Sequence, residues 1–287
     1  MKYLVTLVFF CFSISSIAQV HEKKLLNEVD LSQLQQEPYN SWYASNFDSY
    51  HPNSTIVDAL KKQKPSNYSI KIYFGSWCGD SKRELPRMMR LLKEINFSEK
   101  NIVLIGVDDS TEVYKQSPKR LEAGLNIYRV PTFIIYDGKN EVSRIVEYPV
   151  ETLERDLLKI VSRQAYQPNY AAYQQINQWK KEGLLTDENI SARGLAMKIK
   201  GNVSSESELN ACGYVMMASG EMKEAITVFR VNANLFPQSA NCYDSLGEAY
   251  AKSGVTDKAI QAYEIALRLD PTNTGIQERL KKLKEGS

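Results

Sequence analysis

The stretch Tyr68-Ser-Ile-Lys-Ile-Tyr-Phe74, followed closely by Trp77-Cys78-Gly79-Asp80-Ser81, decides the fold of the first half of the chain. The first segment is rich in β-branched and aromatic residues and predicts a strand. Beyond Ser81, apolar residues recur at helical spacing at Leu85, Met88, Met89, Leu92 and Ile95. Cys78 is therefore predicted at a strand-to-helix junction.

A helix N-terminus presents free N–H groups that favour a thiolate over a thiol, and the thiolate is the nucleophile. Asp80 places a negative charge nearby that opposes this effect. The alternative for a lone cysteine is a small buried hydrophobe. Trp77 and Gly79 on either side, together with the strand-to-helix context, favour a reactive thiol.

Length and composition indicate about two globular domains. The chain has 287 residues, of which 43% are hydrophobic, and a formal net charge of +2. This near-neutral charge gives no support for a nucleic-acid partner.

Residues 1–18 predict an export signal. Lys2 supplies the positive start, the run from Leu4 to Ile14 is apolar, and Ser16-Ile17-Ala18 is a small-x-small cleavage site. A membrane anchor is the alternative, but the apolar run is shorter than the roughly 20 residues that a span needs. We expect a periplasmic or secreted protein cleaved after Ala18, with Cys11 removed and no stable transmembrane anchor.

The chain after Cys78 predicts a βαβ unit followed by a hairpin. Pro86 lies inside the helical pattern, where it suggests a bend. The run Asn101–Asp108 is almost continuously apolar, as in a strand that is covered on both faces. A second strand, Phe133–Tyr136, meets a returning strand, Val142–Val146, across the turn signal Asp137-Gly138.

Residues 60–163 resemble the thioredoxin family in three features: the Trp-Cys-Gly loop at Trp77, the helix proline Pro86, and the Val130-Pro131-Thr132 step. The resemblance implies an α/β thioredoxin-like domain over residues 19–164 with an N-terminal helical extension. It also implies that Pro131 is cis beside Cys78, although cis occurs in only about 5–6% of X–Pro bonds.

In this resemblance Trp77, Cys78 and Ser81 form the catalytic loop, and Val130, Pro131 and Thr132 bind an extended substrate strand through their backbone. Two positions depart from the family. Ser81 replaces the second cysteine, and Ile72 replaces an acidic proton-relay residue. Ser81 is expected to donate a hydrogen bond to the Cys78 sulfur, to cap the helix, or to do both.

The longer pattern from Gly75 to Pro86, with Arg144 to Pro149, resembles exported thioredoxin-family proteins of Bacteroidetes type. Arg144 and Glu147 could flank the thiol, but alternating charges on a strand more often form its solvated face.

The second half contains two repeats, 206–239 and 240–273, with a period of 34 residues. Small and aromatic residues match in one register, with Gly213, Ala225 and Phe229 corresponding to Gly247, Ala259 and Tyr263. The period and pattern resemble tetratricopeptide (TPR) repeats, which implies an all-α domain over residues 206–287. We expect a helical connector at 165–205 and a capping helix at Ile276–Leu283.

Three cysteines remain after the predicted cleavage, so at least one is free or paired between molecules. Cys212 and Cys242 lie on the first helices of neighbouring repeats, where a disulfide is conceivable but small buried hydrophobes are preferred. His21 and His51 have no ligand-like spacing to the cysteines, and we expect neither a metal nor a cofactor.

The leading hypothesis is an exported thiol-disulfide exchange protein in which Cys78 attacks a protein disulfide and an external thiol resolves the product. The TPR groove would bind a protein or peptide partner. The alternative is a non-catalytic scaffold that binds partners through both domains. A peroxidase that uses sulfenic chemistry at Cys78 ranks last, because the approach to Cys78 lacks the Pro/Thr-rich sequence of peroxiredoxins.

Overall fold

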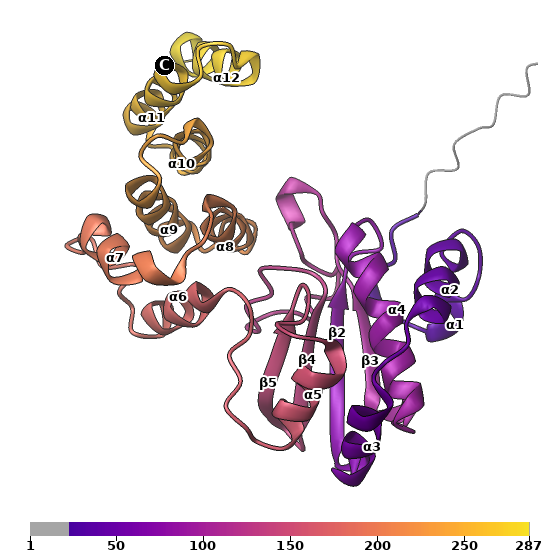
Figure 1. The fold of residues 1–287 in the computed structure, drawn as a ribbon. Coiled ribbons are helices and arrows are strands. Elements are labelled where there is room, and N and C mark those ends of the chain that lie inside the picture. The colour runs from indigo at the N-terminus through magenta and orange to yellow at the C-terminus, as the bar shows by residue number, and fades with distance from the viewer. Residues whose placement is uncertain (1–22, 287) are drawn as a thin grey trace, which may run out of the picture.

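The computed structural model describes residues 23–286. An α/β part with a five-stranded sheet is followed by a curved stack of helices that rises from one side of it (Figure 1). The export signal, the cleavage site after Ala18, Cys11 and His21 lie outside the described residues. Among the helices that are described, none combines the length and apolarity needed to cross a membrane.

The sheet has the order β1-β3-β2-β4-β5. Its strands are β1 (Asn27–Val29), β2 (Tyr68–Phe74), β3 (Ile102–Gly106), β4 (Thr132–Asp137) and β5 (Asn140–Val146). β2 pairs parallel with β3, and β4 pairs antiparallel with both β2 and β5. The predicted βαβ unit and hairpin are therefore confirmed, and Gly138 takes a positive φ of 58° in the hairpin turn.

Strand β1 was not expected from the sequence. It pairs antiparallel with β3, and Asn27 lies opposite Gly106. A Cβ atom at Gly106 would lie 2.0 Å from the Leu25 carbonyl oxygen, so only glycine lets the two segments approach this closely. The three-residue strand is too short and too polar to show a period in the sequence.

Helices cover one face of the sheet. They are α1 (Leu31–Leu34), α2 (Asn40–Ser49), α3 (Ser54–Lys62), α4 (Gly79–Glu94) and α5 (Leu153–Val161). Ile70, Ile72 and Phe74 point from β2 into the core beneath these helices, and all three are fully buried. Tyr73 points to the opposite face, where the segment 107–131 takes the place of a helix.

The helical part repeats a two-helix unit. Its helices are α6 (Ala171–Lys181), α7 (Ala192–Ile199), α8 (Glu206–Ala218), α9 (Met222–Leu235), α10 (Ala240–Lys252), α11 (Thr256–Leu269) and α12 (Thr274–Glu285). A Cβ atom at Gly213 would lie 2.5 Å from the Phe229 ring, and one at Gly247 would lie 2.7 Å from the Tyr263 ring. These contacts confirm that glycines admit the aromatic rings between paired helices.

The two parts share a hydrophobic core. Tyr128 and Val146 come from the α/β part and are buried in one cluster with Tyr173, Leu209 and Cys212 of the helical part. The loop residues Thr111–Val113 also contact α8. The predicted domain junction at residues 164 and 165 falls between the end of α5 and the start of α6. The helical part is therefore packed against the sheet domain and is not merely tethered to it.

Candidate functional site

Cys78 occupies the predicted strand-to-helix junction. It is the N-cap residue of α4, and its N–H donates to the Gly75 carbonyl at 2.9 Å. The residue is only partly buried. The thiol therefore lies at the positive end of a helix of four turns and is accessible from solvent.

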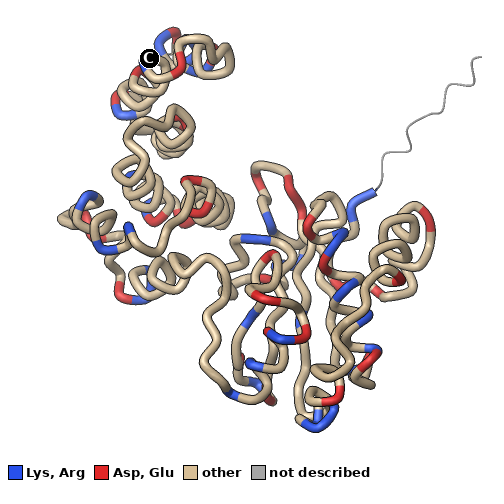
Figure 2. Tube along the Cα trace, viewed as in Figure 1, with Lys and Arg blue, Asp and Glu red and all other residues tan. Residues whose placement is uncertain are grey.

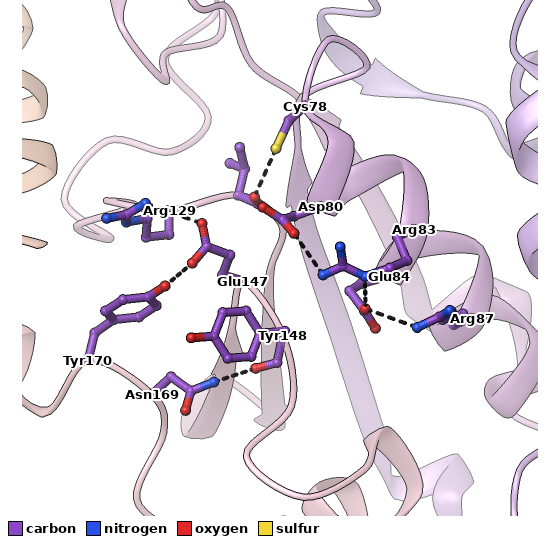
Figure 3. A network of polar contacts seen from close by, with 11 residues as sticks. Cys78, Asp80, Arg83, Glu84, Arg87, Arg129, Glu147, Tyr148, Asn169 and Tyr170 are labelled. Atoms are coloured by element: carbon purple, nitrogen blue, oxygen red, sulfur yellow. Dashed lines mark hydrogen bonds and ion pairs between the residues drawn. The ribbon is translucent and has the colours of Figure 1, made fainter. Parts of the chain in front are cut away.

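The thiol faces the segment before β4 (Figure 3). Cys78 Sγ donates a hydrogen bond to the Val130 carbonyl oxygen at 3.3 Å, and the Val130–Pro131 peptide is cis, as predicted. The Val130 N–H has no hydrogen-bond partner within residues 23–286. Val130 thus presents an unused backbone donor beside the sulfur atom.

Pro131 and Thr132 are engaged within the protein. The Pro131 carbonyl accepts from the Glu147 N–H at 2.7 Å, and Thr132 Oγ1 donates to the Arg129 carbonyl at 2.7 Å. Of the three residues predicted to bind substrate, Val130 alone has a backbone N–H without a partner in the described chain, and the residue itself is 2% exposed.

Trp77 braces the loop. Its Nε1 donates to the Val107 carbonyl at 2.8 Å, which ties the segment after β2 to the segment after β3. A Cβ atom at Gly75 would lie 2.4 Å from the Trp77 ring, so the glycine makes room for the indole.

Ser81 differs from both of its predicted roles. It is the third residue of α4 and fully buried, and its Oγ accepts from the Gly75 N–H at 3.1 Å. Cys78 is the N-cap residue, and the described structure contains no hydrogen bond between Ser81 Oγ and Cys78 Sγ. The physical reason is that helical side chains lean towards the N-terminus, which carries the hydroxyl past the thiol to the buried Gly75 amide.

The negative charge of Asp80 is compensated locally. Asp80 Oδ1 lies 2.7 Å from Arg83 Nη2 (Figure 3). Arg83 Nε also contacts the buried Glu84 at 2.6 Å, and Arg87 contacts Glu84 at 3.3 Å. The first two turns of α4 therefore carry a network of two carboxylates and two guanidinium groups.

Arg129 and Glu147 form a second network between the two parts of the chain. Arg129 Nη1 lies 3.3 Å from Glu147 Oε1, and Arg129 Nη2 donates to the Ser207 carbonyl at 2.9 Å. Tyr173 OH accepts from Arg129 Nε at 3.1 Å, and Tyr170 OH donates to Glu147 Oε2. Arg129 thereby links the segment beside the thiol to the start of α8.

Glu147 belongs to the environment of the thiol loop, whereas Arg144 does not. Burial raises the pKa of the Glu147 carboxyl, Arg129 opposes this, and the charge of Asp80 raises it further. Arg144 instead contacts Glu141 at 2.6 Å and the Leu125 carbonyl at 2.8 Å. Of the two charged residues considered at the end of the hairpin, Glu147 thus lies in the surroundings of the thiol loop and Arg144 does not.

Lys115 was not expected at the site. Its side chain is 4% exposed, and Nζ lies 3.7 Å from the centre of the Tyr114 ring. The pKa of Lys115 is lowered to about 7, first because the side chain is buried and second because Arg129 repels the ammonium group. Negative charge at Cys78 and at Glu147 acts in the opposite direction. In the sequence this lysine stands in a polar segment and resembles a solvated residue.

A cavity of about 770 Å³ lies on the inner side of the helical stack. Tyr114 and Asp109 of the α/β part line it together with Tyr214, Tyr263 and Arg279 of the helical part. Tyr114 and Tyr214 meet edge to face with ring centres 6.5 Å apart. The hollow is thus built by both parts of the chain and shares Tyr114 with the surroundings of the thiol.

Acidic and basic residues are mixed along both parts of the molecule (Figure 2). Cys212 and Cys242 are fully buried and are not paired with each other. Residues 23–286 contain no group of three His, Cys, Asp or Glu side chains that could hold a metal ion.

The sequence of the chain matches no protein-family model and no curated protein.

Proposed function

We propose that the chain is an exported, thioredoxin-like thiol-disulfide exchange protein that uses the single thiol of Cys78 and carries a TPR module. The observation that supports this most directly is the placement of Cys78. The thiol is at the N-terminus of α4 and 3.3 Å from the carbonyl that precedes cis Pro131.

The proposed reaction has two steps. The Cys78 thiolate attacks one sulfur of a protein disulfide, which breaks the substrate S–S bond, forms a mixed disulfide at Cys78 and releases the other substrate sulfur as a thiolate. A second, external thiol then attacks the mixed disulfide and restores the Cys78 thiolate. The external thiol is needed because Ser81 has no sulfur and Cys212 and Cys242 are buried.

The backbone of Val130 is suited to hold an extended substrate segment. Its N–H has no partner within the described chain, and its carbonyl accepts only from the Cys78 thiol. A thiolate has no proton to donate, so ionisation of Cys78 leaves both backbone groups of Val130 available. Main-chain pairing of this kind binds with little dependence on substrate sequence.

The proposal is tested by trapping the mixed disulfide. The purified chain, without residues 1–18, is incubated with oxidised glutathione and with a disulfide-containing protein, and adducts are located by peptide mass spectrometry. We expect an adduct at Cys78 that is lost in Cys78→Ser and retained in Cys242→Ser, the matched control at a buried cysteine. Absence of an adduct at Cys78 with both disulfides would contradict the proposal.

Export is tested separately by expressing the full chain in a Gram-negative host and sequencing the N-terminus of the product from the periplasm. We expect Gln19 as the first residue. Retention of the uncleaved chain in the cytoplasm would contradict the proposed localisation without bearing on the chemistry of Cys78.

The second candidate is a non-catalytic scaffold. It is favoured by the shared cavity, which joins both parts of the chain in one surface, and by the lack of a second accessible cysteine in the described residues. Under this hypothesis partners captured from the native envelope remain bound when Cys78 is replaced by serine. Under the exchange hypothesis they are lost.

A further inference from the structure

Lys115 is an unusual lysine because it is buried without an anionic partner. The side chain is 4% exposed, and no carboxylate oxygen within residues 23–286 lies within 4.0 Å of Nζ. Its nearest described partner is the face of the Tyr114 ring. Burial of an ammonium group without a counter-charge is costly, so such a position is expected to serve a purpose.

The topology brings Lys115 to the same end of the sheet as Cys78. β2 and β3 are parallel neighbours, with Phe74 opposite Gly106, so the segments that follow them emerge side by side. Val107 donates to the Phe74 carbonyl at 2.9 Å, which holds these segments together. The loop after β3 then turns back on itself, and the Lys115 N–H donates to the Asp108 carbonyl at 2.8 Å.

The charged and titratable groups that act on the amine come from several elements, and of these only the Tyr114 ring is in contact with Nζ among the described residues. They are Cys78 at the start of α4, Tyr114 beside it, Arg129 before β4, Glu147 after β5 and Cys212 in α8. Glu147 is already paired with Arg129, and Cys212 is fully buried. Among the carboxyl and thiol groups of this set, Cys78 is therefore the one that is partly exposed and has no ion-pair partner.

We propose that Lys115 is the cationic partner of the Cys78 thiolate and thus a positioning residue for thiol-disulfide exchange. This inference rests on the proposed function. Two forms of the pair hold the same number of protons, namely thiol with neutral amine and thiolate with ammonium. The pair can therefore present the nucleophile without net loss of a proton, and each charge lowers the cost of burying the other.

The helical part contributes to this arrangement. Gln116, next to Lys115, donates through Nε2 to Ser219 Oγ at the end of α8 at 3.3 Å. Helix α8 also contacts Thr111–Val113, in the loop after β3 that carries Lys115. The 4% exposed Lys115 side chain thus lies in a loop that α8 contacts, where charges are screened less than in bulk water.

The first test measures the rate of Cys78 alkylation by iodoacetamide from pH 5.5 to 9.5 with site-resolved mass spectrometry. In Lys115→Met we expect a rate about tenfold lower at pH 6.5, converging with the unmodified chain above pH 9. Lys119→Met is the matched control at an exposed lysine and should behave like the unmodified chain. Lys115→Arg keeps the charge and should restore most of the rate at pH 6.5.

The second test is reciprocal and does not depend on reactivity. The titration of Lys115 is followed through its ¹³Cε chemical shift in the unmodified chain and in Cys78→Ser. Because two linked charges affect each other equally, the midpoint of Lys115 should fall in Cys78→Ser. Circular dichroism of both variants verifies that the fold is retained.

The inference is overturned if Lys115→Met leaves the pH profile of Cys78 alkylation unchanged. It is also overturned if the variant accelerates alkylation equally at every pH, because that result would show only that the loop has opened and exposed the thiol. An unchanged Lys115 midpoint in Cys78→Ser also overturns it. If instead both expected shifts occur but no disulfide reacts at Cys78, the charge pair stands and the proposed exchange function is rejected.

Discussion

Replacing Lys115 by methionine should stabilise the protein, and by an amount that depends on pH. The ordinary pKa of this amine is 10.5, and in the folded chain it is lowered to about 7. Between these values the unfolded chain binds a proton that the folded chain does not hold. Stability of the unmodified protein therefore rises with pH across this window, and the full cost is present below about pH 7.

The magnitude follows from the shift of the pKa. Each unit corresponds to about 1.36 kcal/mol, so a lysine with these two pKa values lowers the free energy of unfolding by about 4 kcal/mol at pH 7 and about 1 kcal/mol at pH 10. Methionine has a similar length and carries no charge. The difference between Lys115→Met and the unmodified chain should therefore shrink by about 3 kcal/mol between pH 7 and pH 10.

Urea unfolding at pH 7, 8.5 and 10, followed by circular dichroism, measures this difference directly. Titration of the groups that are not coupled to Lys115 is common to the two proteins and cancels in the comparison. The reasoning is refuted if the variant is no more stable at pH 7, or if its advantage does not decrease as the pH rises. The first result would mean that the cost of burying Lys115 is fully offset in the folded chain, by the Cys78 thiolate or by another group, and the second that its amine is solvated.

Gly247→Ala should lower the free energy of unfolding by about 1–2 kcal/mol, as measured by urea unfolding. The new methyl group would lie 2.7 Å from the Tyr263 ring, and this steric clash outweighs the gain in helix propensity. Arg129→Met should cost about 2–3 kcal/mol at pH 8, because Glu147 loses its cationic partner. The cost should be smaller at pH 5, where the raised pKa of that carboxyl lets it take up a proton. Ser81→Cys should add a second thiol to the loop and create insulin reductase activity, at a cost of about 1 kcal/mol for the lost hydroxyl hydrogen bond.

Each of these predictions has a control in the same chain. Gly201→Ala introduces a methyl group with no heavy atom within 4 Å and should be nearly neutral. Arg155→Met removes an exposed arginine and should show no such pH dependence. Ser253→Cys adds a thiol far along the chain and should not produce reductase activity. A loss in Arg129→Met that is equal at pH 5 and pH 8 would show that Glu147 is not the source of the cost.

The regular elements of the fold could be predicted because their signals are local. The β-rich run before Cys78, the helical spacing after it and the hairpin turn at Gly138 all depend on neighbouring residues. The helical pairs were located differently, by the similarity of two segments 34 residues apart. Strand β1 escaped prediction because its pairing with β3 depends on a close approach at Gly106 that no local pattern records.

The site was predicted in part. The positions of Cys78 and Val130 followed from motifs, and the structure places them in contact. The bonding of Ser81 could not be read from the sequence, because it depends on which buried amide its hydroxyl reaches. Lys115 was missed for a related reason. Its burial arises when the loop is enclosed between the sheet and α8, and a lysine among polar neighbours gives no local sign of that.

The core that Tyr128 and Val146 share with the helical part bears on how the molecule unfolds and how it can be divided. A chain that ended at residue 164 would expose both side chains to water, and one that began at 165 would expose Tyr173, whose ring packs against Tyr128. The two parts are therefore expected to melt in one cooperative transition, whatever the sequence suggests about a boundary. Substitutions in α8 then become a means of adjusting the loop that carries Lys115, since the same helix contacts Thr111–Val113 of that loop.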